Sequence, residues 1–220
     1  MTTVGFIGAG NIGGTVARLA VAAGYDVVLS NSRTPKTLDD LVASLGIQAR
    51  ATHAAEGAAA SDLVVVSIPL RAYPTVPVEA LIGKPVLDTC NYYPQRDGQI
   101  AVLDNDSMTS GELLAKHLVG AHVVKVFNNI FFKHLAALAR PAGASDRSAL
   151  PIAGDDAGAK ATVTDFLDRI GYDAVDAGPL GAGSRRFQVG TPAYGSPYGK
   201  SNDESGTPAS VATVRSVLGL

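Results

Sequence analysis

Cysteine and charge are both scarce in this sequence. Cys90 is the single cysteine among 220 residues. One thiol can form no internal disulfide, and it cannot supply the paired thiolates of a zinc ribbon or an iron–sulfur site, so we expect no metal site. Charged residues make up 17%, and 18 Lys+Arg against 20 Asp+Glu leave a net charge of −2. Without a broad basic surface to neutralise phosphates, nucleic acid is not an expected partner.

Long hydrophobic runs are also missing. Gly, Asn, Asp and Arg interrupt every apolar stretch well before the roughly 20 residues that a membrane helix needs. The opening segment MTTVGFIGAG has no basic region and leads straight into a strand pattern, which is not typical of a signal peptide. We therefore expect a soluble, cytoplasmic protein with no membrane partner. The 46% apolar content indicates a globular chain that buries a proper core.

Short apolar runs alternate with helical periodicity through the first part of the chain. Strands are predicted at 4–7, 26–30, 47–52, 63–69, 85–88 and 122–127. Helices are predicted at 12–23, 35–45, 53–60, 76–81 and 110–117. Near-continuous runs such as VVV at 64–66 are typical of parallel strands that are covered on both faces. The pattern predicts an α/β fold with a Rossmann-type doubly wound parallel sheet over residues 1–127.

After Phe127 the alternation of strand and helix patterns becomes less regular. This predicts a smaller C-terminal α/β lobe over residues 128–220. Helices are expected at 132–139, at 157–170 and from Thr207-Pro208 onward, and strands at 150–153 and 173–175. Gly, Pro, Ser and Tyr dominate 178–206, which predicts a loop whose role the sequence leaves open. The apolar stripe of the last helix, formed by Val211, Val214, Val217 and Leu218, is expected to serve either the core or a dimer contact.

A glycine-rich turn joins the first predicted strand to the first helix. It reads Gly8-Ala9-Gly10-Asn11-Ile12-Gly13. The first glycine permits a tight turn, the second leaves room for a pyrophosphate, and the third lets the helix pack closely on the sheet. The helix N-terminus then presents free N–H groups and a positive dipole end to the phosphates. In this strand–turn–helix context the motif predicts dinucleotide binding rather than a purely structural turn.

Cofactor choice depends on the end of the second strand. A carboxylate there would bind the ribose hydroxyls of NAD, but this region contains Asn31, Ser32, Arg33 and Lys36 instead. A guanidinium can fork onto a phosphate, an ammonium adds a point charge, and the hydroxyl and amide can donate hydrogen bonds. The alternative is that both cations are solvated beside a helix N-terminus, where positive charge is disfavoured. The sequence favours NADP(H) over NAD(H).

The segments GFIGAGNIGG, NSRTPK, VVVSIPL, DTCNYYP and VVKVFNNI occur in this order through the chain. With them the chain resembles the NADP oxidoreductase family that works with the 5-deazaflavin coenzyme F(420), through about Gly171. The resemblance implies that Ser32, Arg33 and Lys36 read the ribose phosphate. It further implies that the cofactor's ribose and nicotinamide contact Ser67, Ile68, Pro69 and Asn91. It also implies a wall of residues 124–129 where the deazaflavin stacks on the nicotinamide, and a homodimer formed through the C-terminal lobes.

Bulky and polar residues follow the later strands, on the expected acceptor side. We predict that the acceptor contacts Tyr92, Phe127, Asn128, Asn129 and Ile130. The two asparagines either anchor the acceptor or merely cap the next helix, and Tyr92 and its neighbour Tyr93 either close the mouth of the site or pack a loop. Tyr194 and Tyr198 are similarly divided between loop packing and a lid.

No Ser/His/Asp arrangement or other catalytic set stands out. His134, just after the NNI segment, is the best outside candidate for a proton donor, and Cys90 is expected to be a small buried hydrophobe. Hydride transfer between stacked rings requires positioning more than a catalytic side chain, because the cofactors carry the redox chemistry. We therefore expect NADPH to exchange hydride with a deazaflavin or flavin-like acceptor. Two alternatives are reduction of a small imine or carbonyl, and a non-catalytic NADP(H)-sensing module.

Overall fold

Eight strands form one sheet in the computed structural model, which describes residues 2–220. The strands are β1 (Thr3–Ile7), β2 (Asp26–Ser30), β3 (Ala49–Ala51), β4 (Leu63–Val66), β5 (Pro85–Asp88), β6 (His122–Lys125), β7 (Ala149–Gly154) and β8 (Asp173–Asp176). Their order is β3-β2-β1-β4-β5-β6-β7-β8. All neighbours from β3 to β6 pair in parallel, as do β7 and β8, whereas β6 and β7 are antiparallel. The order 3-2-1-4-5-6 is that of a doubly wound Rossmann sheet, which confirms the predicted fold class.

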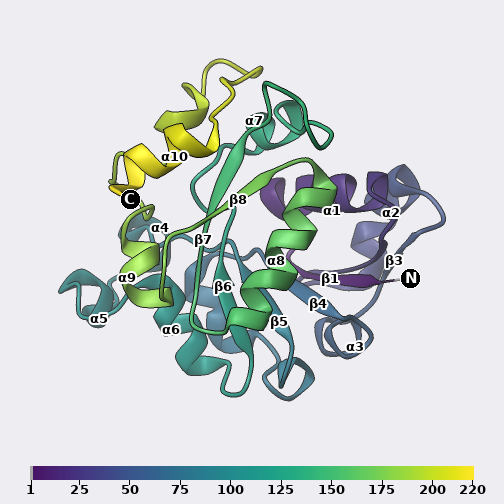
Figure 1. Cartoon of the computed structure of the whole chain (residues 1–220). Helices are drawn as coiled ribbons and strands as arrows, with labels where there is room; N and C mark the ends of the chain where they lie inside the picture. Colours follow the sequence, from purple (N-terminus) through teal and green to yellow (C-terminus); the bar gives the residue numbers. More distant parts are fainter. Residues whose placement is uncertain (1) are drawn as a thin grey trace.

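Helices cover both faces of the sheet and divide its core into two clusters (Figure 1). One face packs against α1 (Asn11–Ala22), α8 (Ala157–Ile170) and α10 (Val211–Leu218). The other face packs against α3 (Ala54–Ala59), α6 (Ser110–His117) and the 3₁₀ helix η2 (Leu70–Thr75). Burial on both faces explains why β4 is Leu-Val-Val-Val without polar alternation.

Capping side chains explain why α6 and α8 begin at the residues that the sequence predicts. In α6 the Thr109 side chain accepts from the backbone N–H of Glu112, whose carboxylate accepts in turn from the backbone N–H of Thr109. This capping box starts the helix at the predicted residue. In α8 the Asp156 side chain caps the N-terminus and Gly171 ends the helix at a φ of 104°. A left-handed residue in this position favours glycine.

The predicted loop at 178–206 is partly helical. It contains α9 (Leu180–Arg185) and the 3₁₀ helix η4 (Ser196–Tyr198). A Cβ added to Gly183 would meet the Cβ of Ala153 at 2.8 Å, so this glycine permits α9 to lie close against β7. The glycine content, which favoured a loop in the sequence, here serves helix packing.

Other elements differ from the expected pattern over short lengths. The predicted helix at 76–81 is reduced to a 3₁₀ turn, since Pro77 restricts the backbone before it. The last helix begins only at Val211, where the Ser210 hydroxyl accepts from the N–H of Thr213. The remaining short helices are η1 (Pro35–Leu38), α2 (Asp39–Leu45), η3 (Glu79–Leu81), α4 (Pro94–Asp97), α5 (Ala101–Asp104) and α7 (Phe132–Ala137).

The C-terminal strands continue the main sheet through the antiparallel pairing of β6 with β7. The division into residues 1–127 and 128–220 stays a prediction. Within residues 2–220, no helix has both the length and the apolar character needed to cross a membrane.

Candidate functional site

The glycine turn lies between β1 and α1, at the centre of the sheet. Gly8 has a φ of 100°, and a Cβ there would lie 2.1 Å from the carbonyl oxygen of Ser67. A Cβ on Gly13 would lie 2.2 Å from the carbonyl oxygen of Gly8. By contrast, a Cβ on Gly10 would meet no atom within 4 Å. Two glycines therefore permit close packing of the protein itself, whereas the third faces open space at the helix N-terminus, where a pyrophosphate can approach.

Asn31 organises the turn that follows β2. Its side-chain oxygen accepts from the backbone N–H of Arg33 at 2.9 Å, and its side-chain amide donates to the Thr37 hydroxyl at 2.9 Å. Ser32, Arg33 and Lys36 are exposed around this braced turn. Neither cation has an ion-pair partner among residues 2–220. The predicted phosphate-reading residues thus lie together at the edge of the sheet with their charges uncompensated.

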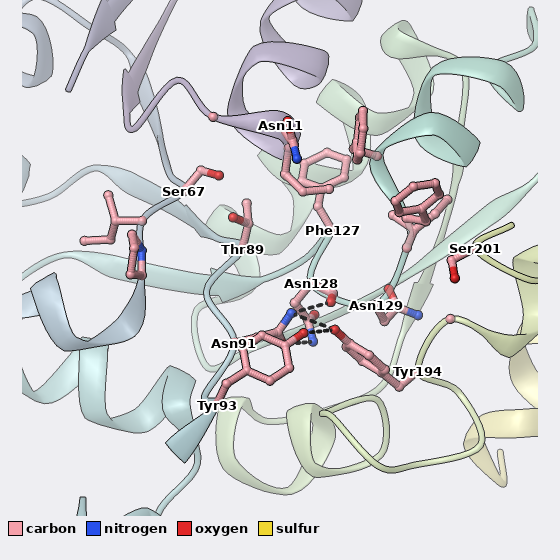
Figure 2. A pocket seen from close by; sticks show the side chains of 18 of the residues that line it. Asn11, Ser67, Thr89, Asn91, Tyr93, Phe127, Asn128, Asn129, Tyr194 and Ser201 are labelled. Carbon is pink, nitrogen blue, oxygen red and sulfur yellow. Dashed lines mark hydrogen bonds between the residues drawn. The ribbon is translucent and has the colours of Figure 1, made fainter. Parts of the chain in front are cut away.

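A cleft of about 700 Å³ opens at the carboxyl ends of the central strands (Figure 2). It lies where the strand order reverses beside β1, the position at which open α/β sheets bind ligands. Most of the predicted cofactor and acceptor residues line it: Gly10, Asn11, Ile12, Ser67, Ile68, Pro69, Asn91, Phe127, Asn128, Asn129 and Ile130. The structure thus brings together segments that are separated by more than a hundred positions in the sequence.

Three asparagines at strand ends form hydrogen bonds to each other or to the C-terminal segment. Asn91 donates its side-chain amide to the carbonyl of Asn128 at 2.7 Å, and Asn128 donates its own to the carbonyl of Phe187 at 3.0 Å. Asn129 donates likewise to the carbonyl of Ala193 at 2.9 Å. The side-chain oxygens of Asn128 and Asn129 are buried and have no hydrogen-bond partner among the described residues. Buried acceptors without donors are uncommon, and two in one wall indicate a place for a ligand that donates.

Phe127 introduces this wall with an unusual backbone. Its φ is 63°, in the left-handed region, and its side chain is fully buried. A bulky residue in this region is strained, and such residues cluster at ligand sites. Asn128 and Asn129 follow directly after Phe127, and both line the cleft.

A buried ion pair lies behind the acceptor wall, and sequence reasoning missed it. Lys125 donates to Asp88 at 2.9 Å, to the Ser110 hydroxyl at 3.0 Å and to the carbonyl of Cys90. Asp88 also accepts from the backbone N–H of Cys90 at 2.8 Å. The pair thereby fixes the backbone that leads into Asn91. The sequence did contain a signal for this pair, because each of two apolar strands ends in a charged residue, Asp88 in one and Lys125 in the other.

Cys90 itself is buried beside this pair. Burial and the neighbouring Asp88 carboxylate raise the pKa of the thiol. A protonated, enclosed thiol is a poor nucleophile, in keeping with its predicted role as a small buried hydrophobe.

Two tyrosines that are 101 residues apart in the sequence meet in the cleft wall (Figure 2). The hydroxyls of Tyr93 and Tyr194 form a short hydrogen bond, and Asn91 donates to the Tyr194 hydroxyl at 3.3 Å. Burial, followed by the contact with Tyr93, raises the pKa of Tyr194, so this phenol is protonated at neutral pH. The Arg96 guanidinium lies 4.9 Å from the centre of the Tyr93 ring. The sequence left Tyr194 between loop packing and a lid, and the structure places it in the wall of the cleft.

Some predicted site residues do not line the cleft. Tyr92 lies outside it, and its hydroxyl donates to Asp104 at 2.6 Å or to the carbonyl of Gly98 at 3.1 Å. His134 is buried under the C-terminal segment, where its ring contacts the carbonyl of Asp203. Tyr93, which the sequence left between the mouth of the site and loop packing, lines the cleft. The lining residues that the sequence did not assign to the site are Thr89, Arg96, Phe131, Phe132, Gly195, Ser196, Gly199 and Ser201. Within residues 2–220, no group of three or more His, Cys, Asp or Glu residues is arranged to hold a metal ion.

The doubly wound sheet and its glycine turn form a Rossmann-like NAD(P)-binding fold, as in dehydrogenases and imine reductases. The resemblance to the family is confirmed: residues 3–92 match the family model described as NADP oxidoreductase, coenzyme F(420)-dependent. The family implies binding of NADP(H). A search of curated proteins finds no match.

Solved structures extend this similarity over most of the chain. A hypothetical protein, SMa0349 from Sinorhizobium meliloti, is 27% identical with a TM-score of 0.76, over 88% of this chain and 93% of that chain. A protein from Arthrobacter sp., described as a candidate F(420)-dependent NADP reductase, is 24% identical with a TM-score of 0.70, over 82% and 86% of the two chains. An imine reductase from Bacillus cereus is 19% identical with a TM-score of 0.58, over 84% of this chain and 57% of that chain. The last two similarities concern the fold alone.

Proposed function

We propose that this protein is an NADP(H)-dependent oxidoreductase that passes hydride between NADPH and a 5-deazaflavin of the coenzyme F(420) type. One observation carries the proposal: the glycine turn and a wall of aromatic and amide side chains share a single cleft of about 700 Å³. Such a cleft has room for two planar ring systems in contact, which is what direct hydride transfer requires.

The residues present fit the dinucleotide. Gly10 offers open space at the N-terminus of α1, where no side chain caps the helix. Arg33 and Lys36 offer uncompensated positive charge beyond β2, where a ribose phosphate belongs. Ser67, Ile68 and Pro69 follow β4, on the side of the glycine turn away from β2, and they line the cleft. When bound, NADP(H) supplies the hydride chemistry, and the protein holds it in position.

The acceptor side fits a flat, polar ring. Phe131 and Phe132 supply apolar surface to the cleft, and Asn128 and Asn129, which also line it, carry two buried oxygens that lack donors. Aromatic faces favour stacked rings, and amide oxygens favour ligand N–H groups. The deazaflavin ring system offers both surfaces.

A second candidate is reduction of a small imine or carbonyl. The observation that favours it is the pair of hydroxyls from Tyr93 and Tyr194 in the cleft wall, because this reaction needs a proton donor beside the nicotinamide. Here the acceptor would be a small molecule, with the same NADP(H) site.

The assembly and location are also proposals. We propose a homodimer that pairs through residues 128–220, and a cytoplasmic location. Light scattering of the purified protein tests the first, because a monomeric mass at micromolar concentration contradicts it.

Spectroscopy tests the main proposal directly. Mixing protein, NADPH and oxidised F(420) should bleach the deazaflavin absorbance at a rate proportional to enzyme. A cyclic imine and a small ketone, followed by NADPH absorbance, test the second candidate. Tight NADPH binding with no acceptor reduced at high enzyme concentration would contradict both and leave a nucleotide-sensing role.

A further inference from the structure

We propose that Tyr194 is the catalytic proton donor of this cleft, and that the acceptor is an unsaturated nitrogen heterocycle that takes hydride on carbon and a proton on nitrogen. This inference rests on the proposed function, since it needs NADPH as the hydride source. It adds the residue that completes the reaction and the class of acceptor that the residue serves.

Elimination narrows the choice of donor to two side chains. Of the described residues that line the cleft, none is Asp, Glu, His, Lys or Cys. Arg96 keeps its proton at any physiological pH, and serine and threonine hydroxyls are much weaker acids than a phenol. Tyr93 and Tyr194 are therefore the two groups in the cleft wall that can release a proton during turnover.

Hydrogen bonding around Tyr194 distinguishes the two. Its oxygen lies within reach of the Asn91 side-chain amide, which can only donate, and of the Tyr93 hydroxyl. Either hydroxyl can donate in the hydrogen bond between the two tyrosines. With Tyr93 as its donor, both lone pairs of the Tyr194 oxygen are occupied, and the proton of Tyr194 is left to point to a ligand. Tyr93 and Asn91 are then positioning residues, and Tyr194 is the donor.

Neighbouring groups hold this arrangement in place. Arg96 donates to the carbonyl of Asn91 at 2.7 Å and covers the ring of Tyr93, while Asp97 pairs with Arg96 at 2.8 Å. The positive charge of the guanidinium also favours the tyrosinate that forms when the proton leaves. Side chains fixed by such contacts lose little entropy when they act.

The reaction balances with these groups. Hydride leaves NADPH with its bonding pair and adds to the acceptor carbon, so the carbon is reduced and the nicotinamide oxidised. The π pair of the C=N bond, direct or conjugated, becomes a lone pair on nitrogen. Tyr194 releases its proton to that nitrogen, the O–H bond breaks and an N–H bond forms. Tyr93 then passes a proton to the tyrosinate and regains one from solvent.

Three phenylalanine variants test the inference. Oxidised F(420) and methylpyrroline, a cyclic imine, serve as acceptors. With Tyr194→Phe we expect kcat to fall about 100-fold, the usual contribution of a general acid. The lost rate should return in part with the concentration of buffer acid, which a merely structural defect would not show. In Tyr93→Phe we expect a smaller fall in kcat, and the rate should not depend on the concentration of buffer acid. Tyr73→Phe is the matched control, because Tyr73 is half-buried but lies outside the cleft, where its ring packs against His117, and it should keep the wild-type rate.

A binding measurement supplements turnover. Pyrrolidinone, a lactam that cannot be reduced here, presents a carbonyl oxygen to the proposed donor. Calorimetry on the complex with NADP⁺ should show an affinity about five-fold weaker for Tyr194→Phe, as loss of one hydrogen bond predicts, with NADPH affinity unchanged. Wild-type turnover and lactam affinity in Tyr194→Phe would overturn the inference and leave the proposed function intact. Failure of the wild-type protein to reduce either acceptor would instead overturn the proposed function, and the assignment of Tyr194 with it.

Discussion

The two ends of the cleft are built in different ways. At the nucleotide end, the turns after β1 and β2 are short, and their functional groups are backbone or exposed cations held by one asparagine. At the acceptor end, amides and phenols are buried in a network that joins the strand ends to residues 187–194. The first end is local in sequence, and the second is assembled from distant segments.

The two ends should therefore differ in which substitutions they tolerate. An exposed cation contributes to ligand binding with little effect on folding, since solvent replaces it. A buried amide or ion pair is held by several partners, so its removal leaves others unsatisfied. Substitutions at the nucleotide end should therefore separate binding from stability, whereas those at the acceptor end should couple them.

Two glycines of the same turn give the largest expected contrast. Gly13→Ala places a Cβ 2.2 Å from the carbonyl oxygen of Gly8, so α1 cannot keep its place on the sheet. We expect a loss of more than about 4 kcal/mol in the free energy of unfolding, measured by urea denaturation. In Gly10→Ala the new Cβ meets no protein atom within 4 Å. That variant should keep the wild-type midpoint and lose NADPH binding. Equal stability of the two variants would contradict this assignment.

The buried ion pair should give the next largest effect, at the acceptor end. Lys125→Met leaves the Asp88 carboxylate, which is 0% exposed, without its cation. Removing one partner of a buried pair costs about 3–5 kcal/mol. The double variant Lys125→Met with Asp88→Asn removes the stranded charge and keeps an oxygen for the N–H of Cys90, so it should regain part of the loss. A double variant less stable than Lys125→Met would show that the pair does not act in this way.

The turns of the nucleotide end follow from local signals: the glycine turn joins a strand to a helix as predicted, whereas the role of Arg33 and Lys36 stays a prediction. The glycine spacing in GAGNIG and the residue types after β2 are both contained in short stretches of the sequence. The acceptor end was predicted in part: Phe127, Asn128 and Asn129 line the cleft, but Tyr194 was left between two roles and Tyr92 lies outside the cleft. Adjacent tyrosines leave a turn in opposite directions, and no local pattern shows which one faces inward. Tyr93 and Tyr194 are 101 residues apart, so their contact depends on the path of the chain between them, which no local pattern gives.

Arg33→Ala should sharpen the contrast from the nucleotide end. The exposed guanidinium has no ion-pair partner in the described part of the chain, so its loss should not affect folding. Binding of NADPH should weaken by about 1.5–3 kcal/mol, as loss of a charge-assisted hydrogen bond predicts, while NADH binding stays the same. Calorimetry with both nucleotides measures this. Indifference of the unmutated protein to the ribose phosphate would remove the basis for the NADP assignment.

Lys36→Ala should give the smallest of these effects. Lysine presents a flexible point charge rather than a planar fork, and an exposed charge is screened by salt. We expect NADPH binding to weaken by about 0.5–1 kcal/mol at low ionic strength, with less effect at high salt. Calorimetry at two salt concentrations separates this behaviour from that of Arg33→Ala, whose bidentate contact should persist at high salt. A loss as large and as salt-resistant as that of Arg33→Ala would place Lys36 in direct, enclosed contact with the phosphate, so that the nucleotide end would be more like the acceptor end than this turn suggests.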